Sequence, residues 1–191
     1  MKNLIKNLTV RDIDGLTLSL LSEFITDPEA KNYFLEEAGK EHYKLLAYFS
    51  TLFNDTQITD IGTYKGCSAL ALSFNKTNTI YSFDVVDNRK LSNLYNINNL
   101  QNIIFILSDC VRWYKDILLK SKIIFLDVNH DGEYEYKVFN CLIENNYKGY
   151  LILDDINLNQ TMKNFWTSIT KEKIELTHLG HFSGTGLVYF D

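Results

Sequence analysis

The feature that most constrains this chain is a series of five short apolar segments, each of which stops beside a glycine or an aspartate. The segments span residues 58–61, 80–85, 103–107, 122–126 and 150–153, and they are rich in the β-branched and aromatic residues that favour strands. The residues beside which they stop are Gly62, Asp84, Asp109, Asp127 and the pair Asp154–Asp155. Segments with helical spacing of apolar residues separate them, so the pattern predicts βα units built into a parallel sheet.

The last part of the chain breaks this alternation. Residues 174–179 and 186–190 have the composition of strands, and the loop 180–185 joins them without a helix. A hairpin after five βα units predicts an antiparallel edge on an otherwise parallel sheet. The expected fold class is therefore a three-layer α/β fold. Its helices are expected in one long segment from residue 29 to 52 and at residues 16–24, 67–72, 89–97, 111–119, 134–145 and 160–169.

Composition predicts a single domain. The chain has 191 residues, 46% of them hydrophobic, and one proline, so it can bury a sizeable core and has no Pro-rich linker. We expect a helical N-terminal extension, residues 1–54, that packs on a core formed by residues 55–191. The net charge of −5 argues against broad binding to nucleic acid or to an anionic membrane. No apolar run has the length needed to cross a bilayer, and a homo-oligomer is compatible with the composition.

The cysteines indicate a reducing environment. Cys67, Cys110 and Cys141 are an odd number and lack the C-x-x-C spacing of a metal site. Each lies in an apolar segment predicted to be helix or strand. We therefore expect buried free thiols and a cytoplasmic protein.

The first predicted strand leads into a turn suited to ligand binding. The sequence Asp60-Ile61-Gly62-Thr63-Tyr64-Lys65-Gly66 lies between strand and helix, so backbone N–H groups and a helix N-terminus gather at one point. The turn is not a P-loop, because Cys67 follows Gly66 where lysine is required. Nor is it a dinucleotide turn, because Tyr64 occupies the position of the glycine that lets a pyrophosphate approach. An acidic residue and two glycines suit a ligand with an amino-acid moiety and a nucleoside but no phosphate.

S-Adenosylmethionine has the parts that these residues would accommodate. Asp60 is expected to meet its ammonium group, directly or through a water, and the glycine turn is expected to approach its carboxylate. Asp84 suits the two ribose hydroxyls, and Asp109 is expected to accept a hydrogen bond from the adenine amino group. The candidate cofactor-binding residues are Asp60, Gly62, Tyr64, Gly66, Ser68, Asp84, Asp109 and Cys110.

The order of these motifs resembles that of class I S-adenosylmethionine-dependent methyltransferases. The resemblance covers roughly residues 55–191 and is carried by the glycine turn together with Phe83-Asp84, Ser108-Asp109, Leu126-Asp127 and Leu153-Asp154-Asp155. The chain is most similar to small O-methyltransferases, which include catechol-type enzymes and macrocin-type sugar methyltransferases. The resemblance implies a Rossmann-like, mostly parallel sheet with an antiparallel C-terminal hairpin, and methyl transfer to a hydroxyl group.

The resemblance also implies a metal site. In the methyltransferase topology the strands that end at Asp127 and at Asp154–Asp155 are neighbours, about 4.8 Å apart, so these carboxylates can converge on one cation. Carboxylate oxygens suit Mg²⁺ or Ca²⁺, and Mg²⁺ is the expected ion. Such a cation would orient a substrate hydroxyl and stabilise the alkoxide.

The expected general base is less conventional. Macrocin-type enzymes use the second aspartate of an Asp-x-Asp sequence, but here Asp127 is followed by Val128 and Asn129, which cannot accept the proton. His130 comes next, and its ordinary pKa near 6.5 makes it the candidate base beside Asp127. The alternatives are that His130 only orients Asp127 or caps the following helix, or that Asp131 acts instead.

The main functional hypothesis is an S-adenosylmethionine-dependent O-methyltransferase, assisted by a divalent metal, with a small molecule or a glycan as acceptor. His181 in the last loop is a candidate for substrate contact, and an ordinary glycine-rich turn is the alternative interpretation. One rival hypothesis is a metal-independent enzyme that uses His130. Another is a cofactor-binding scaffold without catalysis, which Asn129 would allow. Tyr64 disfavours a nicotinamide-dependent reductase.

Overall fold

The computed structural model describes residues 5–92, 94 and 100–191. Seven strands of this described chain form one sheet in the order β3-β2-β1-β4-β5-β7-β6. Neighbours among β1 to β5 run parallel, whereas β7 runs antiparallel to both β5 and β6. The mostly parallel sheet with an antiparallel C-terminal hairpin is confirmed. The strands are β1 (Gln57–Ile61), β2 (Thr79–Asp84), β3 (Ile103–Leu107), β4 (Ile123–Leu126), β5 (Gly149–Leu153), β6 (Lys173–Glu175) and β7 (Gly186–Phe190).

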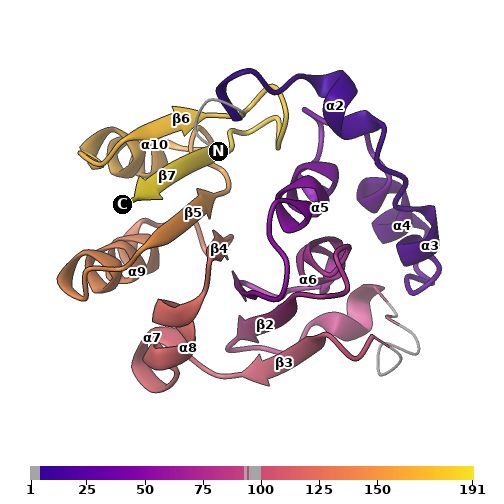
Figure 1. The fold of residues 1–191 in the computed structure, drawn as a ribbon, viewed down its shortest axis with the longest axis horizontal. Helices are drawn as coiled ribbons and strands as arrows, with labels where there is room; N and C mark the ends of the chain where they lie inside the picture. Colours follow the sequence, from indigo (N-terminus) through magenta and orange to yellow (C-terminus); the bar gives the residue numbers. More distant parts are fainter. Residues whose placement is uncertain (1–4, 93, 95–99) are drawn as a thin grey trace.

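Helices cover both faces of the sheet (Figure 1). The N-terminal helices and α6 lie on one face, and α7 to α10 lie on the other. The helices are α2 (Val10–Asp14), α3 (Ser19–Ser22), α4 (Pro28–Phe34), α5 (Tyr43–Thr51), α6 (Cys67–Leu72), α7 (Cys110–Trp113), α8 (Lys115–Lys120), α9 (Glu133–Glu144) and α10 (Gln160–Ser168), with a 3₁₀ helix η1 (Arg89–Ser92).

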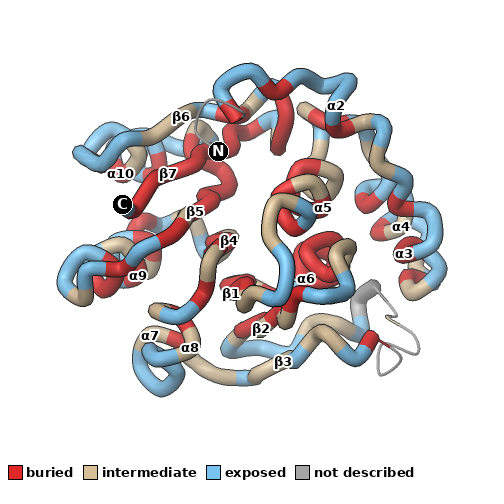
Figure 2. The backbone as a smooth tube through the Cα atoms, in the orientation of Figure 1, coloured by how far each residue is buried: buried red, intermediate tan, exposed pale blue. Residues whose placement is uncertain are grey.

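Two apolar cores form because alternate residues of each strand point to opposite faces of the sheet. On β4, Phe125 packs into the core that contains Leu45 of α5, whereas Ile124 packs into the core that contains Val138 of α9. Buried residues accordingly run through the central strands in Figure 2. Burial on both faces explains why these strands read as continuous apolar runs in the sequence.

Hydrogen bonds continue past the strand ends and align the predicted site residues. The Gly62 N–H donates to the Phe83 carbonyl (2.9 Å), the Asp127 N–H to the Ile61 carbonyl (2.9 Å) and the Asp154 N–H to the Leu126 carbonyl (3.1 Å). Gly62, Asp127 and Asp154 therefore stand side by side at one edge of the sheet. Since β1 pairs with β2 on one side and β4 on the other, this edge is the topological switch point, where open α/β sheets bind ligands.

The predicted long helix over residues 29–52 is wrong. The segment forms two helices, α4 and α5, and residues 35–42 between them include Gly39 with a φ of +89°. The apolar stripe continues across the break because Phe34 and Leu45 both reach the same core.

Smaller differences occur elsewhere. The predicted helix over 111–119 is two short helices, α7 and α8, and the strand predicted to end at 179 ends at Glu175. Of the helix predicted over 89–97, the first part is η1, and residues 93 and 95–97 lie outside the described residues. Cys67, Cys110 and Cys141 are buried and free, as predicted.

Every helix in residues 5–92, 94 and 100–191 is too short or too polar to span a membrane.

Candidate functional site

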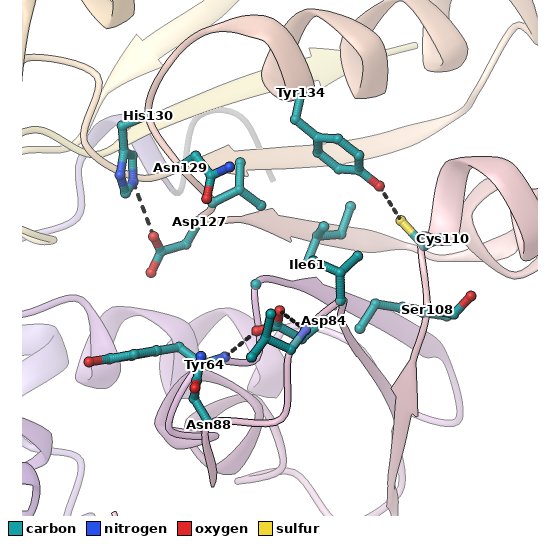
Figure 3. A pocket seen from close by; sticks show the side chains of 15 residues that line it. Ile61, Tyr64, Asp84, Asn88, Ser108, Cys110, Asp127, Asn129, His130 and Tyr134 are labelled. Carbon is teal, nitrogen blue, oxygen red and sulfur yellow. Dashed lines mark hydrogen bonds and ion pairs between the residues drawn. The ribbon is translucent and has the colours of Figure 1, made fainter. Parts of the chain in front are cut away.

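A cavity of about 500 Å³ opens at the carboxyl ends of β1, β2 and β4 (Figure 3). Its volume lies in the range that small-molecule and cofactor sites occupy. Six of the residues predicted from the sequence line it: Gly62, Tyr64, Asp84, Cys110, Asp127 and His130. The cavity therefore joins the expected cofactor residues to the expected catalytic residues.

The glycine turn allows the backbone at the cavity wall to pack closely. Gly62 has a φ of +97°, and a Cβ at this position would lie 1.6 Å from the Asp127 carbonyl oxygen. Gly66, with a φ of +85°, immediately precedes α6 as its N-cap. Both positions need the conformational freedom of glycine, and any side chain at residue 62 would push the ends of β1 and β4 apart.

Asp84 is held by the backbone of two neighbouring segments. Its Oδ2 accepts a hydrogen bond from the Tyr64 N–H (2.8 Å), and its Oδ1 accepts one from the Val86 N–H (3.0 Å). A carboxylate has about four acceptor positions, so two hydroxyl groups can still donate to it. This arrangement fits the predicted contact with a ribose.

Asp60 lies beneath the turn and does not line the cavity. It is fully buried, its Oδ2 accepts from the Ser82 hydroxyl (2.5 Å), and its Oδ1 has no hydrogen-bond partner among the described residues. Burial raises the pKa of Asp60 to about 7, against the opposing effect of the Ser82 hydrogen bond. Contact of Asp60 with a ligand ammonium group stays a prediction.

Asp109 also lies apart from the cavity wall. Its Oδ1 accepts hydrogen bonds from the Tyr134 hydroxyl (2.8 Å) and the Arg112 N–H (3.0 Å), and its Oδ2 accepts one from Lys137 Nζ (2.6 Å). Ser108 and Cys110, on either side of it, line the cavity instead. The contact between Asp109 and adenine stays a prediction.

A second cavity of about 200 Å³ adjoins the first. It shares Gly62, Tyr64 and Asp127 with the larger cavity, and the predicted residue Ser68 lines it. The N-terminal segment supplies much of its remaining wall, through Ala30, Tyr33, Glu41, His42 and Tyr43. The segment before the sheet therefore shapes a part of the site that the βα units alone would leave open.

Beyond Asp127, carboxylates and imidazoles alternate along the edge of the sheet. His130 Nε2 lies 3.2 Å from Asp127 Oδ1 and 3.2 Å from Asp155 Oδ2. His181 Nδ1 lies 3.2 Å from Asp155 Oδ1 and 3.3 Å from Asp154 Oδ2. The three carboxylates predicted to bind a metal are thus brought together, with His130 and His181 between them.

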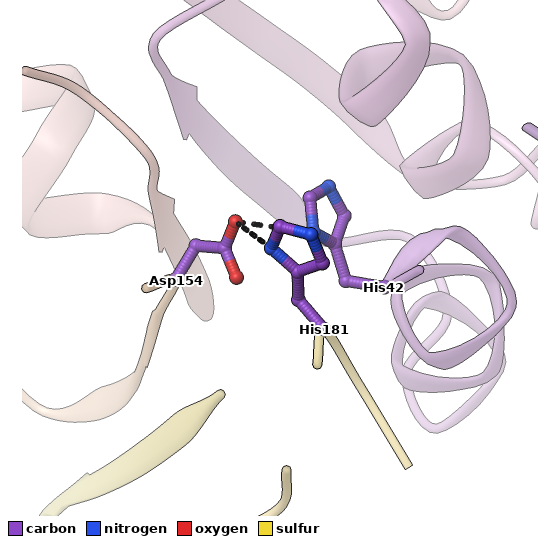
Figure 4. A group of neighbouring side chains, drawn as sticks. All are labelled: His42, Asp154 and His181. Carbon is purple, nitrogen blue, oxygen red and sulfur yellow. Dashed lines mark ion pairs between the residues drawn. The ribbon is translucent and has the colours of Figure 1, made fainter. Parts of the chain in front are cut away.

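His42, from the segment before α5, is the third histidine that contacts these carboxylates. Its Nδ1 lies 3.3 Å from Asp154 Oδ2, the oxygen that His181 also approaches (Figure 4). His42 and Asp154 are both buried, and the far nitrogen of His181 lies 3.7 Å from Glu41 Oε1. We call these residues the histidine–aspartate cluster: His42, Asp127, His130, Asp154, Asp155 and His181.

The backbone is strained at two members of the cluster. His130 and Asp155 each have a φ of +57°, a region that non-glycine residues seldom adopt. The His130 N–H donates to Glu135 Oε1 (3.0 Å), and its carbonyl accepts from Asn159 Nδ2 (2.8 Å), so α9 and the start of α10 hold this conformation. Strain of this kind gathers at functional sites, where surrounding structure enforces it.

Mutual attraction within the cluster alters its titration. Burial disfavours the charged form of each histidine, but the contacts with Asp127, Asp154 and Asp155 outweigh burial. The pKa of His42 and the pKa of His130 are therefore raised, and the pKa of His181 is raised to about 10. For Asp154, burial is outweighed by His42 and His181, and its pKa falls. For Asp127, burial outweighs the contact with His130, and its pKa rises.

Sequence reasoning missed His42 and Glu41, because both lie in the segment predicted to be the middle of a long helix. The sequence shows that the chain has four histidines, but only the structure shows that three of them converge on Asp154 and Asp155. His181, predicted from its loop, is in the cluster.

No protein-family model matches the sequence, and no curated protein does either. Solved structures do match the fold. A methyltransferase of Podospora anserina bound to S-adenosylhomocysteine aligns with 91% of this chain and 87% of its own, with a TM-score of 0.65 and 13% identity. A Staphylococcus aureus protein with the provisional name caffeoyl-CoA O-methyltransferase aligns over 100% and 98%, with a TM-score of 0.60 and 15% identity.

The chain has the S-adenosylmethionine-dependent methyltransferase fold. A third example is an S-adenosylmethionine-dependent O-methyltransferase of Thermotoga maritima, which matches 77% of this chain and 63% of its own at a TM-score of 0.54 and 11% identity. Identities this low establish the fold alone. Within the methyltransferase fold, the candidate site occupies the crevice at the carboxyl ends of the parallel strands.

Proposed function

We propose that this protein is an S-adenosylmethionine-dependent O-methyltransferase that acts on a hydroxyl of a small molecule or glycan with the help of a divalent cation. The observation that carries the proposal is the continuous cavity of about 500 Å³ between Asp84 and the pair Asp127 and His130. A nucleoside at the Asp84 end would present its reactive group toward the acidic end. Proximity of this kind is the main contribution that a methyltransferase scaffold can make to an in-line transfer.

The cofactor is proposed to lie along the glycine turn. Asp84 would accept hydrogen bonds from the ribose hydroxyls, and the wall formed by Ser108 and Cys110 would face the adenine. The turn around Gly62 lets the amino-acid moiety approach the backbone, and Asp60 beneath it supplies negative charge near the ammonium group when ionised. The unpartnered Asp60 Oδ1 supports such a role, because buried polar atoms are seldom left without a partner.

His130 is proposed to act as the general base. In the reaction, His130 takes the proton of the acceptor hydroxyl as the oxygen attacks the methyl carbon, and the carbon–sulfur bond breaks to leave a neutral thioether. Asp127, 3.2 Å from His130 Nε2, orients the ring and stabilises the imidazolium that forms. Asn129 lines the same cavity but cannot take up a proton.

The residues fit a divalent cation. Asp127, Asp154 and Asp155 gather around His130 and His181, and the buried Asp154 Oδ1 has no hydrogen-bond partner in the described part of the chain. The strand-end carboxylates would hold Mg²⁺ or another divalent ion. When bound, the ion would orient the acceptor hydroxyl and lower its pKa. The smaller cavity, with Tyr33 and Tyr43 in its wall, offers aromatic surface that suits a sugar ring.

Calorimetric titration with S-adenosylmethionine, followed by transfer of its labelled methyl group to a panel of hydroxylated acceptors, tests the proposal. We expect one cofactor per chain and transfer to at least one alcohol. No binding at millimolar cofactor would overturn it. Cofactor binding without turnover on any acceptor would favour the scaffold hypothesis, and activity that survives EDTA and Asp154→Ala would favour a metal-independent enzyme.

A further inference from the structure

The part of the cluster around Asp154 differs from a site built of carboxylates. His42 Nδ1 and His181 Nδ1 each lie 3.3 Å from the same oxygen, Asp154 Oδ2. One ligand atom from each of the three residues lies within 4.8 Å of the others. The three side chains come from the segment before α5, the end of β5 and the loop before β7, and they point toward one another in Figure 4.

Two buried polar atoms of this group lack hydrogen bonds. His42 Nδ1 and Asp154 Oδ1 have no hydrogen-bond partner within the described residues, although His42 is 4% exposed and Asp154 is 2% exposed. Buried polar atoms are seldom left without a hydrogen bond. A cation held between His42 Nδ1 and the Asp154 carboxylate would give the imidazole nitrogen a partner.

The spacing around Asp154 Oδ2 fits metal coordination. A tetrahedral ion with bonds of about 2.0–2.1 Å places neighbouring ligand atoms about 3.3 Å apart, which is the separation between Asp154 Oδ2 and each imidazole nitrogen. The other nitrogen of His181 faces Glu41 Oε1 at 3.7 Å, and metal-bound histidines commonly pair their second nitrogen with a carboxylate in this way. Binding would require His181 Nδ1 to give up its 2.8 Å contact with the Ser183 hydroxyl.

We propose that His42, Asp154 and His181 bind a transition-metal dication, with Zn²⁺ as the first candidate. Two imidazoles and one carboxylate favour Zn²⁺ over Mg²⁺, which prefers oxygen ligands in an octahedron. His42 also lines the smaller cavity, so the ion would lie beside the space where an acceptor would enter. The inference rests on the proposed function and revises the ligand set of its cation, because Asp154 is the one strand-end carboxylate that it keeps. Metal binding can be measured without methyl transfer.

The test uses the full chain, stripped of metal with a chelator and titrated with Zn²⁺, Co²⁺ and Mg²⁺ in the absence of cofactor. We expect one Zn²⁺ per chain, little competition from Mg²⁺, and visible absorption bands of Co²⁺ in a low-coordinate site with nitrogen ligands. The Co²⁺ spectrum needs no variant, so it stays informative even if substitutions in the buried cluster unfold the protein.

Variants assign the ligands. We expect His181→Gln and Asp154→Asn to weaken Zn²⁺ binding about 100-fold or more. His178→Gln is the matched control, since His178 is the remaining histidine, is exposed and lies three residues from His181. The inference is overturned if wild-type protein binds no Zn²⁺ or Co²⁺, if Mg²⁺ competes equally, or if both variants retain wild-type affinity while folded by circular dichroism. The same samples are also titrated with S-adenosylmethionine. Cofactor binding without Zn²⁺ binding would overturn the metal site alone, whereas absence of cofactor binding would overturn the proposed methyltransferase.

Discussion

A side chain at Gly62 would begin 1.6 Å from the carbonyl oxygen of Asp127. The contact is with backbone that is fixed by pairing between β1 and β4, and the φ of +97° adds strain for any other residue. We therefore expect Gly62→Ala to lower the free energy of unfolding by about 3 kcal/mol or more, measured by urea denaturation. Gly15→Ala is the control: Gly15 has a φ of −65°, its added Cβ meets nothing closer than 3.8 Å, and the variant should be as stable as wild type. An unchanged urea midpoint for Gly62→Ala would contradict the close packing of Gly62 against the Asp127 backbone.

Replacing Asp84 should weaken cofactor binding more than it weakens the fold. Asp84→Ala removes the acceptor proposed for the ribose hydroxyls and also releases the Tyr64 and Val86 N–H groups. We expect at least about tenfold weaker binding of S-adenosylmethionine by calorimetry, since two hydrogen bonds to a charged group are lost. Asp116→Asn, at an exposed position in the first turn of α8, should bind the cofactor like wild type. Equal affinities for wild type and Asp84→Ala would exclude Asp84 from the cofactor site.

Replacing His130 should slow transfer without preventing cofactor binding. His130→Asn suits the test because asparagine tolerates the φ of +57° at this position. Loss of a general base typically costs about 10²–10⁴ in rate, so we expect kcat to fall within that range while cofactor affinity stays constant. The variant Asp131→Asn distinguishes the alternative base, because its side chain is exposed and Asn keeps the acceptor for the Glu133 N–H. A normal rate for His130→Asn with a slow Asp131→Asn would reverse the assignment.

Asp60 should make stability depend on pH in an identifiable window. Its pKa in the folded protein is about 7, against 3.8 for an ordinary aspartate, so the folded state keeps a proton that the unfolded state loses. The stabilising contribution of protonated Asp60 is fully present below pH 3.8 and is lost as the pH rises to about 7. Asp60→Asn lacks this dependence.

Relative to wild type, Asp60→Asn should therefore gain about 2–3 kcal/mol of stability between pH 5 and pH 8. Urea denaturation of both proteins at the two pH values measures the difference, and comparing the proteins at each pH cancels the titration of all other groups. Parallel pH profiles for the two proteins would show that Asp60 titrates normally in the fold.

The sheet could be predicted because its information is local. Each parallel strand is a short apolar run that stops at a small or acidic residue, and the observed strand ends at Ile61, Asp84, Leu107, Leu126 and Leu153 follow that pattern. The residues at these ends were predicted to share a crevice, and Gly62, Asp84 and Asp127 do line one cavity. That β4 and β5 are neighbours was implied by the resemblance to methyltransferases, and the observed strand order confirms it.

The remaining features depend on contacts between distant segments. Phe34 and Leu45 are buried in the same core, so their periodicity continued through a break that only the backbone at Gly39 reveals. The oxygens of Asp109 are engaged by Tyr134 and Lys137 of α9, which no local pattern around residue 109 could indicate. His42 was not predicted as a member of the cluster, because its contact with Asp154 also joins segments that are distant in the sequence.

His42 precedes the first strand of the sheet, and His181 comes just before the last. On a ribosome, the loop that carries His181 emerges after β1 to β5 have been made, so the three side chains around Asp154 cannot meet in a shorter nascent fragment. The three side chains can meet only after the segment before β1 and the loop before β7 have both packed against the end of β5. A chain truncated before His181 would lack the cluster around Asp154.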